Sequence, residues 1–520
     1  MRKEKLVGTK RGLEIILLGI SLVIGISGYI IVTINRGEKL PSNLFLHIGF
    51  LIFISLILHL FIRKFTPYAD PIILPIAVAI NGVGLAMIYR LNLSYQKLGQ
   101  TGFDVGNKQL MWTFVGVVCC VLVCVVLPDH RVLKNYTYIA GLSAIILLLL
   151  PMIPGLGRDI YGAKIWIGIG PLSFQPSEIA KLCLVIFFAG YFVDTGDKLA
   201  LAGKKILGLK LPRIRDCGPL IIAWLASIAV LVLQRDLGSS LLIFGLFVAM
   251  LYVATDKISW IIAGGVLFVP AAFLAAHIFP HVGARFNIWW NAFDNTVYHQ
   301  NPGGSGQLVS GLFGMANGGL TGTGWGKGFP QLVPFANSDF IIASIGEELG
   351  LTGFMAIITL YIILVQRGFK AAETIRDNFG KMFATGLVFI IALQVFVIVG
   401  GVTRLIPLTG LATPFLAYGG SSLVSNWIIL GLLLRLTNNA RVNSLFEKEV
   451  VLMEYEPVKE VVTVSGSSSS FDNQNKVNVV HKDSLNAKNL SNVNKITENN
   501  RVHTDNSADY INRSDSEVKE

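Results

Sequence analysis

Apolar runs long enough to cross a membrane recur along most of this chain of 520 residues. A bilayer core is about 30 Å thick, and every backbone polar group inside it must find a partner, so such runs have to be helical. Only 14% of the residues are charged, against about 25% in soluble proteins. The sequence therefore predicts an all-α, polytopic integral membrane helical bundle of about twelve transmembrane helices. The weakest of these are the short runs Gly218–Leu233 and Gly238–Ala254.

Basic residues predict which side of the membrane each loop occupies. Lysine and arginine crowd the N-terminus, the loop after Val193 and the loop that contains Arg367, Lys370 and Arg376. Cytoplasmic loops carry such an excess. Both termini are therefore predicted to be cytoplasmic, and the large segments on the opposite, outer side are 92–108, 154–177 and 279–338.

Composition and motifs exclude several classes of function. The net charge of +11 is typical of cytoplasmic loops in a membrane protein, so no nucleic-acid partner is predicted. No P-loop, dinucleotide fingerprint or internal repeat occurs, which disfavours an ATP-driven pump. The five cysteines fit neither a zinc site nor a disulfide framework, and no metal site is predicted. The polar residues 437–520 are predicted to form a disordered cytoplasmic tail.

The outer segment 279–338 is rich in Gly, Trp, Asn and Phe and has little periodicity. Long loops of this kind are usually functional or disordered, and the aromatic residues argue against disorder. Its glycines, among them Gly319, Gly322, Gly324 and Gly326, would let the backbone approach a ligand closely. We therefore expect a functional, large extracytoplasmic loop here.

Ionisable residues from distant parts of the chain are predicted at this outer side. Cations at the outer side run against the usual excess of Lys and Arg in cytoplasmic loops. They are explained either by an anionic ligand, such as a lipid-linked phosphate or pyrophosphate, or by ion pairing among the residues themselves. The set is Arg158, Lys164, Glu178, Lys181, Arg235, Asp236, Arg285, Lys327, Asp339, Glu347, Glu348 and Arg404.

For the cations and their neighbours, structural alternatives stay open at this point. Glu178 and Lys181, spaced i, i+3 at a helix start, could simply be an ion pair. Arg235 and Asp236 could be a turn clamp. Arg285 could extend to lipid headgroups or contact a phosphate, and Lys327 could contact substrate from the glycine-rich loop.

Three acids at the entry to an apolar run, Asp339, Glu347 and Glu348, raise the same question. If Asp339 opens a helix, Glu347 is about 80° from it around the axis and Glu348 about 180°. Glu347 is then the expected neighbour of Asp339, and Glu348 is expected to pair with a basic group elsewhere. Asp339 itself could be a helix N-cap or could accept a proton from a sugar hydroxyl.

Five motifs in order carry a resemblance to the SEDS family of bacterial cell-shape, division and sporulation proteins (RodA, FtsW and SpoVE). They are FQPSEIAKL, LQRDLGSSLLIFG, GGLTGTGWGKG, NSDFIIASIGEELG and PLTGLATPFLAYGGSS. The resemblance covers residues 71–436 and implies a ten-helix core, so residues 1–70 are a cytoplasmic N-terminus with two extra transmembrane helices. The stretch 68–91 is more similar to RodA-like members that carry such an extension.

The resemblance implies a peptidoglycan glycosyltransferase in the bacterial cytoplasmic membrane, for elongation or division. Its substrate would be lipid II, the undecaprenyl-pyrophosphate-linked disaccharide–pentapeptide, and its partner a class B penicillin-binding protein, a transpeptidase. The family's catalytic aspartate falls on Asp339. Substrate would be bound by Lys181, Arg235, Arg285 and Lys327, and the site supported by Glu178, Asp236, Glu347 and Glu348. No cofactor is implied with certainty, and a divalent cation, Mg²⁺ or Mn²⁺, could assist at the pyrophosphate.

Two other functions compete with this interpretation. A lipid II flippase would also place charges within the membrane, but it should have charges on both sides and a repeat between its halves. The gathering of polar residues on one side favours the enzyme. A scaffold for morphogenesis proteins would not need Asp339 at all.

Overall fold

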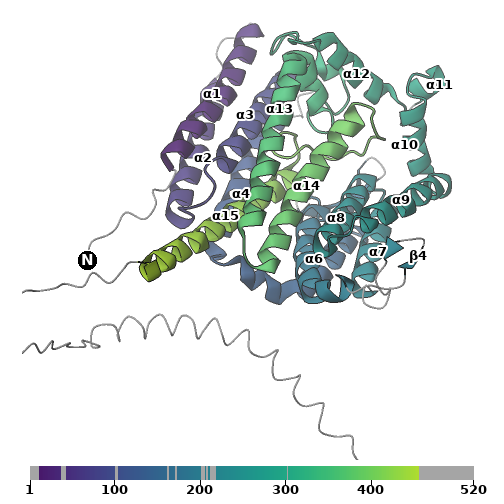
Figure 1. The fold of residues 1–520 in the computed structure, drawn as a ribbon. Coiled ribbons are helices and arrows are strands. Elements are labelled where there is room, and N and C mark those ends of the chain that lie inside the picture. The colour runs from purple at the N-terminus through teal and green to yellow at the C-terminus, as the bar shows by residue number, and fades with distance from the viewer. Residues whose placement is uncertain are drawn as a thin grey trace, which may run out of the picture. The chain divides into compact units, whose positions relative to one another are not determined.

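The helices form because the apolar runs leave the backbone no partner in lipid except itself. A computed structural model describes residues 11–36, 42–99, 104–160, 163–169, 172–200, 205–206, 209–210, 218–300 and 303–455 (Figure 1). The helices are α1 (Arg11–Asn35), α2 (Ser42–Phe65), α3 (Ile73–Lys97), α4 (Val105–Val126), η1 (His130–Tyr136), α5 (Thr137–Leu149), η2 (Leu150–Met152), α6 (Ser177–Ala200), α7 (Gly218–Leu233), α8 (Leu237–Thr255), α9 (Ser259–Ile278), α10 (Pro280–Trp290), α11 (Asn295–Tyr298), α12 (Gly306–Gly318), η4 (Pro330–Leu332), α13 (Ile341–Thr374), α14 (Asn378–Val402) and α15 (Gly420–Tyr455).

Eleven helices among the described residues are long and apolar enough to cross a membrane. The twelfth predicted run, Gly218–Leu233, is helical as α7 but has 16 residues. At 1.5 Å per residue it is about 24 Å long, somewhat short of a hydrocarbon core of about 30 Å. The prediction of a multi-pass helical membrane protein with about twelve helices is confirmed.

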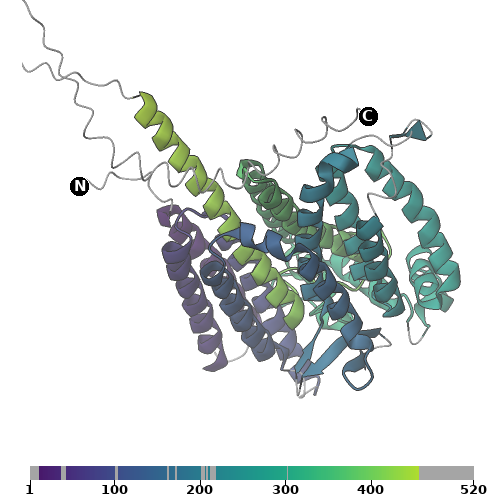
Figure 2. The same ribbon diagram turned by 90° about the horizontal axis from the view of Figure 1, so that it is seen from below.

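Helix α3 is buried by its neighbours along its whole apolar length. It packs against α1, α4 and α13, while α15 packs along α4 (Figure 2). A Cβ on Gly84 of α3 would overlap the backbone of Leu416, so only glycine permits this approach. By contrast α9 is largely exposed, as expected for a helix surrounded by lipid.

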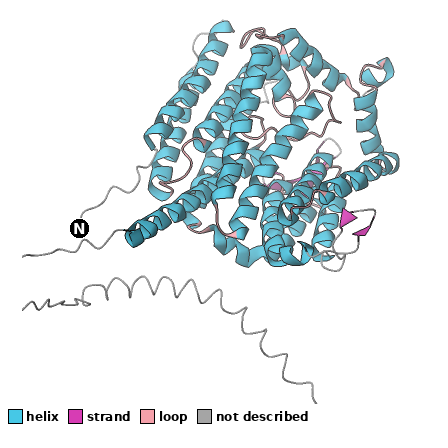
Figure 3. Ribbon diagram, viewed as in Figure 1, coloured by secondary structure: helices cyan, strands magenta, loops and turns pink. Residues whose placement is uncertain are grey.

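Short strands, which the sequence analysis did not predict, lie between helices (Figure 3). The strands β1 (Gly157–Ile160), β2 (Ala163–Ile169) and β3 (Leu172–Phe174) form an antiparallel sheet with Arg158 opposite Trp166 and Ile167 opposite Phe174. This sheet carries the exposed Arg158 and Lys164. The two-residue strands β4 (Lys205–Ile206) and β5 (Leu209–Lys210) also pair.

The segment 279–338, expected to have little periodicity, contains α10, α11, α12 and η4. Helix α12 packs on α13 through Gly311, where a Cβ would lie 2.7 Å from the ring of Phe340. The glycines that blur the hydrophobic period thus serve helix packing. The expectation that this segment is a loop with little periodicity is therefore wrong where α10, α11 and α12 form.

At the C-terminal end, α15 runs on to Tyr455, past residue 437 where the tail was predicted to begin. The described residues up to Tyr455 belong to one compact unit. Residues 456–520 of the predicted tail, and most of the basic N-terminus and of the loop after α6, lie outside the described residues.

Candidate active site

Asp339 lies in the turn that leads into α13. The helix begins at Ile341, its N-cap residue is Phe340, and no side chain caps it. Asp339 therefore neither opens the helix nor caps it. The angles of about 80° and 180° predicted for Glu347 and Glu348 relative to Asp339 assumed that it opens the helix, so they do not apply. The turn is tied to the chain before α15, because the Tyr418 N–H donates to the Asn337 carbonyl at 2.8 Å. The Asp339 carboxylate is half-buried.

The cation beside Asp339 is Arg285 of α10. A Cβ built on Gly410 would lie 3.5 Å from Asp339 Oδ2 and 3.8 Å from a terminal nitrogen of Arg285. Burial raises the pKa of Asp339 to about 6, and the Arg285 charge and a hydrogen bond with Ser338 oppose that rise. A general base works best with a pKa near the operating pH. The pair therefore suits proton abstraction close to neutrality.

Helix α10 is fixed to the residues that follow α14 by a second arginine. Arg404 donates to the carbonyls of Trp289 and Trp290 at 2.9 and 3.0 Å, and the Trp289 indole N–H donates back to the Arg404 carbonyl at 3.0 Å. Arg285 itself donates to the Leu408 carbonyl at 2.7 Å. These bonds set the position of the Arg285 guanidinium.

A second carboxylate, Asp236, interacts with the same guanidinium. It is the N-cap of α8 and accepts the Ser239 N–H at 3.0 Å. Burial raises the pKa of Asp236; the bonds with Ser239 and the Arg285 charge oppose the rise, and Glu178 adds to it. Burial lowers the pKa of Arg285, against the charges of Asp236 and Asp339. The charges of both carboxylates therefore act on Arg285.

The Glu178–Lys181 pair forms as its spacing predicts, with 2.6 Å between Lys181 Nζ and Glu178 Oε2. Both side chains are buried. Lys181 also donates to Gln394 Oε1 at 3.1 Å, and the Gln394 amide donates to the Ala412 carbonyl at 2.7 Å. Sequence analysis missed Gln394, although a lone glutamine in the apolar run of α14 is a signal that could have found it.

One irregular segment, residues 403–419 between α14 and α15, joins these groups. Its carbonyls at Leu408 and Ala412 accept from Arg285 and Gln394, and its Gly410 lies against Asp339. Gly410 has φ +75°, a conformation that favours glycine. We call residues 403–419 the connecting segment; it brings α6, α10, α14 and the turn before α13 to one place.

Two predicted cations, Arg235 and Lys327, are exposed. Arg235 adjoins Asp236, and its charge acts with that of Arg285 on His281: burial chiefly, then Arg235 and Arg285, lower the pKa of His281. His281 was missed by sequence analysis. Lys327 belongs to residues 319–329, the glycine-rich segment, which contacts α1, α3 and α13.

Glu347 and Glu348 are buried and bind this glycine-rich segment. Helix α13 is broken after them, at Gly350, by a backbone with φ 67° and ψ −171°. The carbonyls thus released at Glu347 and Glu348 accept the N–H groups of Thr323 and Gly324, each at 3.0 Å. Their carboxylates accept too: Glu347 from the Phe329 N–H at 2.7 Å and Glu348 from the Gly326 N–H at 2.9 Å.

Glu348 also pairs with Arg90, a fully buried arginine of α3. Arg90 donates further to the Gly328 carbonyl, to Ser94 and to Gln331. The expectation that Glu348 pairs with a basic group elsewhere is met. Arg90 was missed, although a lone arginine inside an apolar run is a strong signal.

A separate apolar groove of about 800 Å³ runs between α13 and α14. Its lining includes Tyr361, Phe369 and Phe396, and it reaches Thr403 and Leu405 of the connecting segment. None of the polar residues around Asp339 lines it, so the groove is a different surface from the polar site.

Comparisons with known proteins bear on this arrangement. The FtsW/RodA/SpoVE family model, described as cell cycle protein, matches residues 71–442. The peptidoglycan glycosyltransferase RodA of Mycobacterium tuberculosis (strain ATCC 25618 / H37Rv) is 44% identical over 83% of this chain and 92% of its own length. The probable peptidoglycan glycosyltransferase FtsW of Geobacter sp. (strain M18) is 31% identical over 72% and 97%.

Solved structures share the fold. A chain reported under "Structural coordination of polymerization and crosslinking by a peptidoglycan synthase complex" has a TM-score of 0.56 and 24% identity, over 72% of this chain and 98% of its own. A mutant of the Thermus thermophilus rod shape determining protein RodA has a TM-score of 0.51 and 21% identity, over 71% and 98%. The predicted resemblance, nearer to RodA than to FtsW, is thereby confirmed, and the chain belongs to the FtsW/RodA/SpoVE family of cell cycle proteins.

Proposed function

We propose that this chain is a peptidoglycan glycosyltransferase that polymerises lipid II into glycan strands. The names of its relatives support this activity. The observation that carries the assignment of the site is Asp339, a half-buried carboxylate with a pKa raised to about 6 beside the Arg285 guanidinium. A base of this strength is suited to a sugar hydroxyl near neutral pH.

In the proposed reaction Asp339 accepts the proton of the 4-hydroxyl of the acceptor's N-acetylglucosamine. The hydroxyl oxygen attacks C1 of the donor's N-acetylmuramic acid, the new glycosidic bond forms, and the bond from C1 to undecaprenyl pyrophosphate breaks. The leaving pyrophosphate carries away the bonding electron pair as negative charge. Preorganised cations stabilise such developing charge.

We assign that electrostatic role first to Arg285, and then to the exposed Arg235 and Lys327. Lys181 is buried and already bound to Glu178 and Gln394, so we give it the role of shaping the site through the connecting segment, with substrate contact as a secondary role. Glu178 and Asp236 support the cations, whereas Glu347 and Glu348 fix the glycine-rich segment.

The part of the chain that the structure describes offers a divalent cation no ready-made protein site. Among the residues that the structure describes, no group of three or more His, Cys, Asp or Glu side chains could hold a metal ion. Mg²⁺ commonly binds through one or two carboxylates plus substrate phosphates. Pyrophosphate oxygens would have to supply most of the ligands, and the proposed proton transfer does not depend on a metal.

We further propose that the chain lies in the bacterial cytoplasmic membrane with both termini in the cytoplasm and the site at the outer face. The grouping of Asp339, Arg285 and Asp236 at one end of α13 supports this orientation. At the other end of that helix Arg367 pairs with Asp70, which also binds Arg441, in keeping with basic cytoplasmic loops. By resemblance, we propose a class B penicillin-binding protein as the partner.

The test is polymerisation of labelled lipid II by the purified chain, with its partner transpeptidase, in proteoliposomes. Asp339→Asn should lower the rate by about 10²- to 10⁴-fold, the usual contribution of a general base. The matched control is Asp294→Asn, because Asp294 is an exposed carboxylate that only caps α11. Equal rates for wild type and Asp339→Asn would remove Asp339 from the chemistry. No polymer from wild type, together with lipid II crossing the bilayer, would favour a flippase.

A further inference from the structure

The last turns of α1 contact the glycine-rich segment directly. The Asn35 amide donates to the Trp325 carbonyl at 2.6 Å. A Cβ on Gly28 would lie 2.5 Å from the Trp325 ring, and one on Gly326 would lie 3.3 Å from the backbone of Val32. Helix α1 and the glycine-rich segment therefore fit together through glycines on both sides and one buried tryptophan.

A second connection runs from Arg36, the residue that follows α1, to the acids of α13. The Arg36 guanidinium donates to Ser94 Oγ at 2.9 Å. Ser94 in turn accepts from Arg90 at 3.0 Å, and Arg90 pairs with Glu348 and donates to the Gly328 carbonyl. Both routes from α1 end on the segment that carries Lys327.

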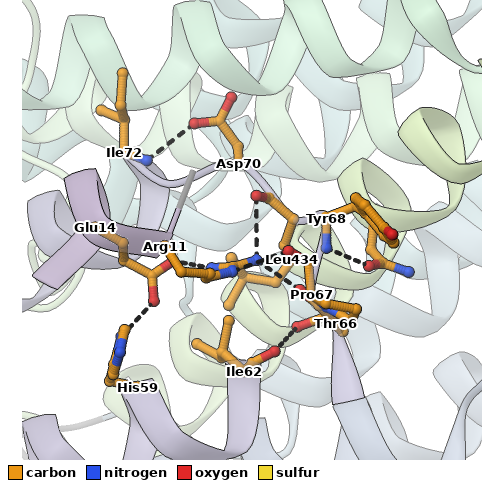
Figure 4. A network of polar contacts seen from close by, with 12 residues as sticks. Arg11, Glu14, His59, Ile62, Thr66, Pro67, Tyr68, Asp70, Ile72 and Leu434 are labelled. Atoms are coloured by element: carbon orange, nitrogen blue, oxygen red, sulfur yellow. Dashed lines mark hydrogen bonds and ion pairs between the residues drawn. The ribbon is translucent and has the colours of Figure 1, made fainter. Parts of the chain in front are cut away.

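The opposite end of α1 is anchored by a buried polar network (Figure 4). Arg11 pairs with Glu14 and donates to the carbonyls of Thr66 and Pro67 at 2.6 and 3.0 Å. Glu14 also bonds His59 of α2 at 2.9 Å. Buried charges with several partners fix geometry strongly, because any displacement leaves a charge unpaired.

The middle of α1 is also fixed, by a close crossing with α3. A Cβ on Gly25 would lie 3.2 Å from the Gly82 Cα, and one on Gly28 would lie 3.0 Å from the Ala86 Cβ. Small residues of this kind let transmembrane helices approach closely. Helix α1 is thus held in place at its first turn and along its middle. It nevertheless precedes residue 71, where the family match begins.

We propose that α1 positions the glycine-rich segment, and that Asn35 is the positioning residue through its bond to the Trp325 carbonyl. The segment needs such support, because Gly319, Gly322, Gly324 and Gly326 all have positive φ and glycine has the most conformational freedom to lose. In the proposed function this segment presents the exposed Lys327 to the pyrophosphate of lipid II. This assignment of Lys327 rests on the proposed glycosyltransferase function.

The kinetic test compares Asn35→Ala and Asn35→Asp with wild type. Loss of one hydrogen bond should raise KM for lipid II about fivefold and leave kcat nearly unchanged. Asn35→Asp keeps the size of the side chain but cannot donate, so it should match or exceed the alanine variant. Adding Asn35→Ala to Lys327→Ala should raise KM little further, because both changes act on one contact. The control is Ile34→Ala, at an exposed position of α1.

Hydrogen exchange provides a readout that does not need activity. In Asn35→Ala, peptides covering 319–329 should exchange faster, since the N–H groups of Thr323, Gly324 and Gly326 bond to α13, while peptides of α14 should not change. Unchanged exchange and KM in Asn35→Ala, or wild-type KM in Asn35→Asp, would overturn the proposal. If the wild type makes no polymer, the proposed function fails, and the exchange result still decides the role of Asn35.

Discussion

The rate of polymerisation should fall when the pH is lowered through the pKa of Asp339. Its pKa is raised to about 6 by burial, and the ionised form is the base, so activity is present above this pH and lost below it. With a pKa of about 6, roughly 97% of the carboxylate is ionised at pH 7.5 and about 9% at pH 5. The acid limb of kcat/KM, which reports the free enzyme, should therefore have its midpoint near pH 6.

Removing the Arg285 charge should move this limb toward higher pH. Arg285 favours the ionised form of Asp339, and a close opposite charge lowers a carboxyl pKa by about 1–3 units, of which we take about one because the site is half-exposed. In Arg285→Gln the midpoint should shift from about 6 to about 7. At pH 6.5 the ionised fraction then drops from about three quarters to about one quarter.

The assay is lipid II polymerisation from pH 5 to 8.5, and the position of the limb is measured rather than the height of the curve. A lower plateau from weaker pyrophosphate binding does not move the midpoint. Arg131→Gln is the control, because Arg131 is exposed and its guanidinium lies 3.6 Å from the carboxylate of Asp377, at the end of α14 opposite the connecting segment. An unmoved midpoint in Arg285→Gln, or a limb that moves to lower pH, would refute the assignment of this pair.

Three further substitutions test the supports of the site. Arg90→Met leaves Glu348 buried without its partner and should lower the stability of the protein by about 3–5 kcal/mol, which is measured as a lower thermal unfolding midpoint in detergent. Adding Glu348→Gln should recover part of this stability, and fully additive effects of the two substitutions would contradict the pairing. Gly350→Ala forces a side chain into a φ of +67° and should cost about 1–3 kcal/mol, whereas Gly19→Ala, whose Cβ meets nothing within 4 Å, should not destabilise the protein. Arg404→Ala releases α10 and should lower kcat/KM with little change in the unfolding midpoint; an unchanged kcat/KM would contradict its positioning role.

Much of the architecture followed from local sequence, because lipid leaves an apolar run one solution, the helix. Even α7 was placed correctly as a helix, although its 16 residues are few for a span. The same logic failed in 279–338, where α12 forms despite a weak hydrophobic period, since its glycines are used to pack on α13. The assumption that Asp339 opens or caps α13 was wrong, since the helix begins at Ile341; a carboxylate before an apolar run also fits an N-cap.

The sequence by itself determined the membrane class, the helices, the family and the importance of Asp339 as a candidate base, because each rests on composition, on a local period or on short motifs. Only the tertiary structure decided what surrounds that carboxylate. Arg90 and Glu348 are 258 positions apart, and Asn35 and Trp325 are 290 apart; no local rule pairs them. The pKa of Asp339 was equally hidden, since it depends on burial and on one guanidinium that the connecting segment holds beside it.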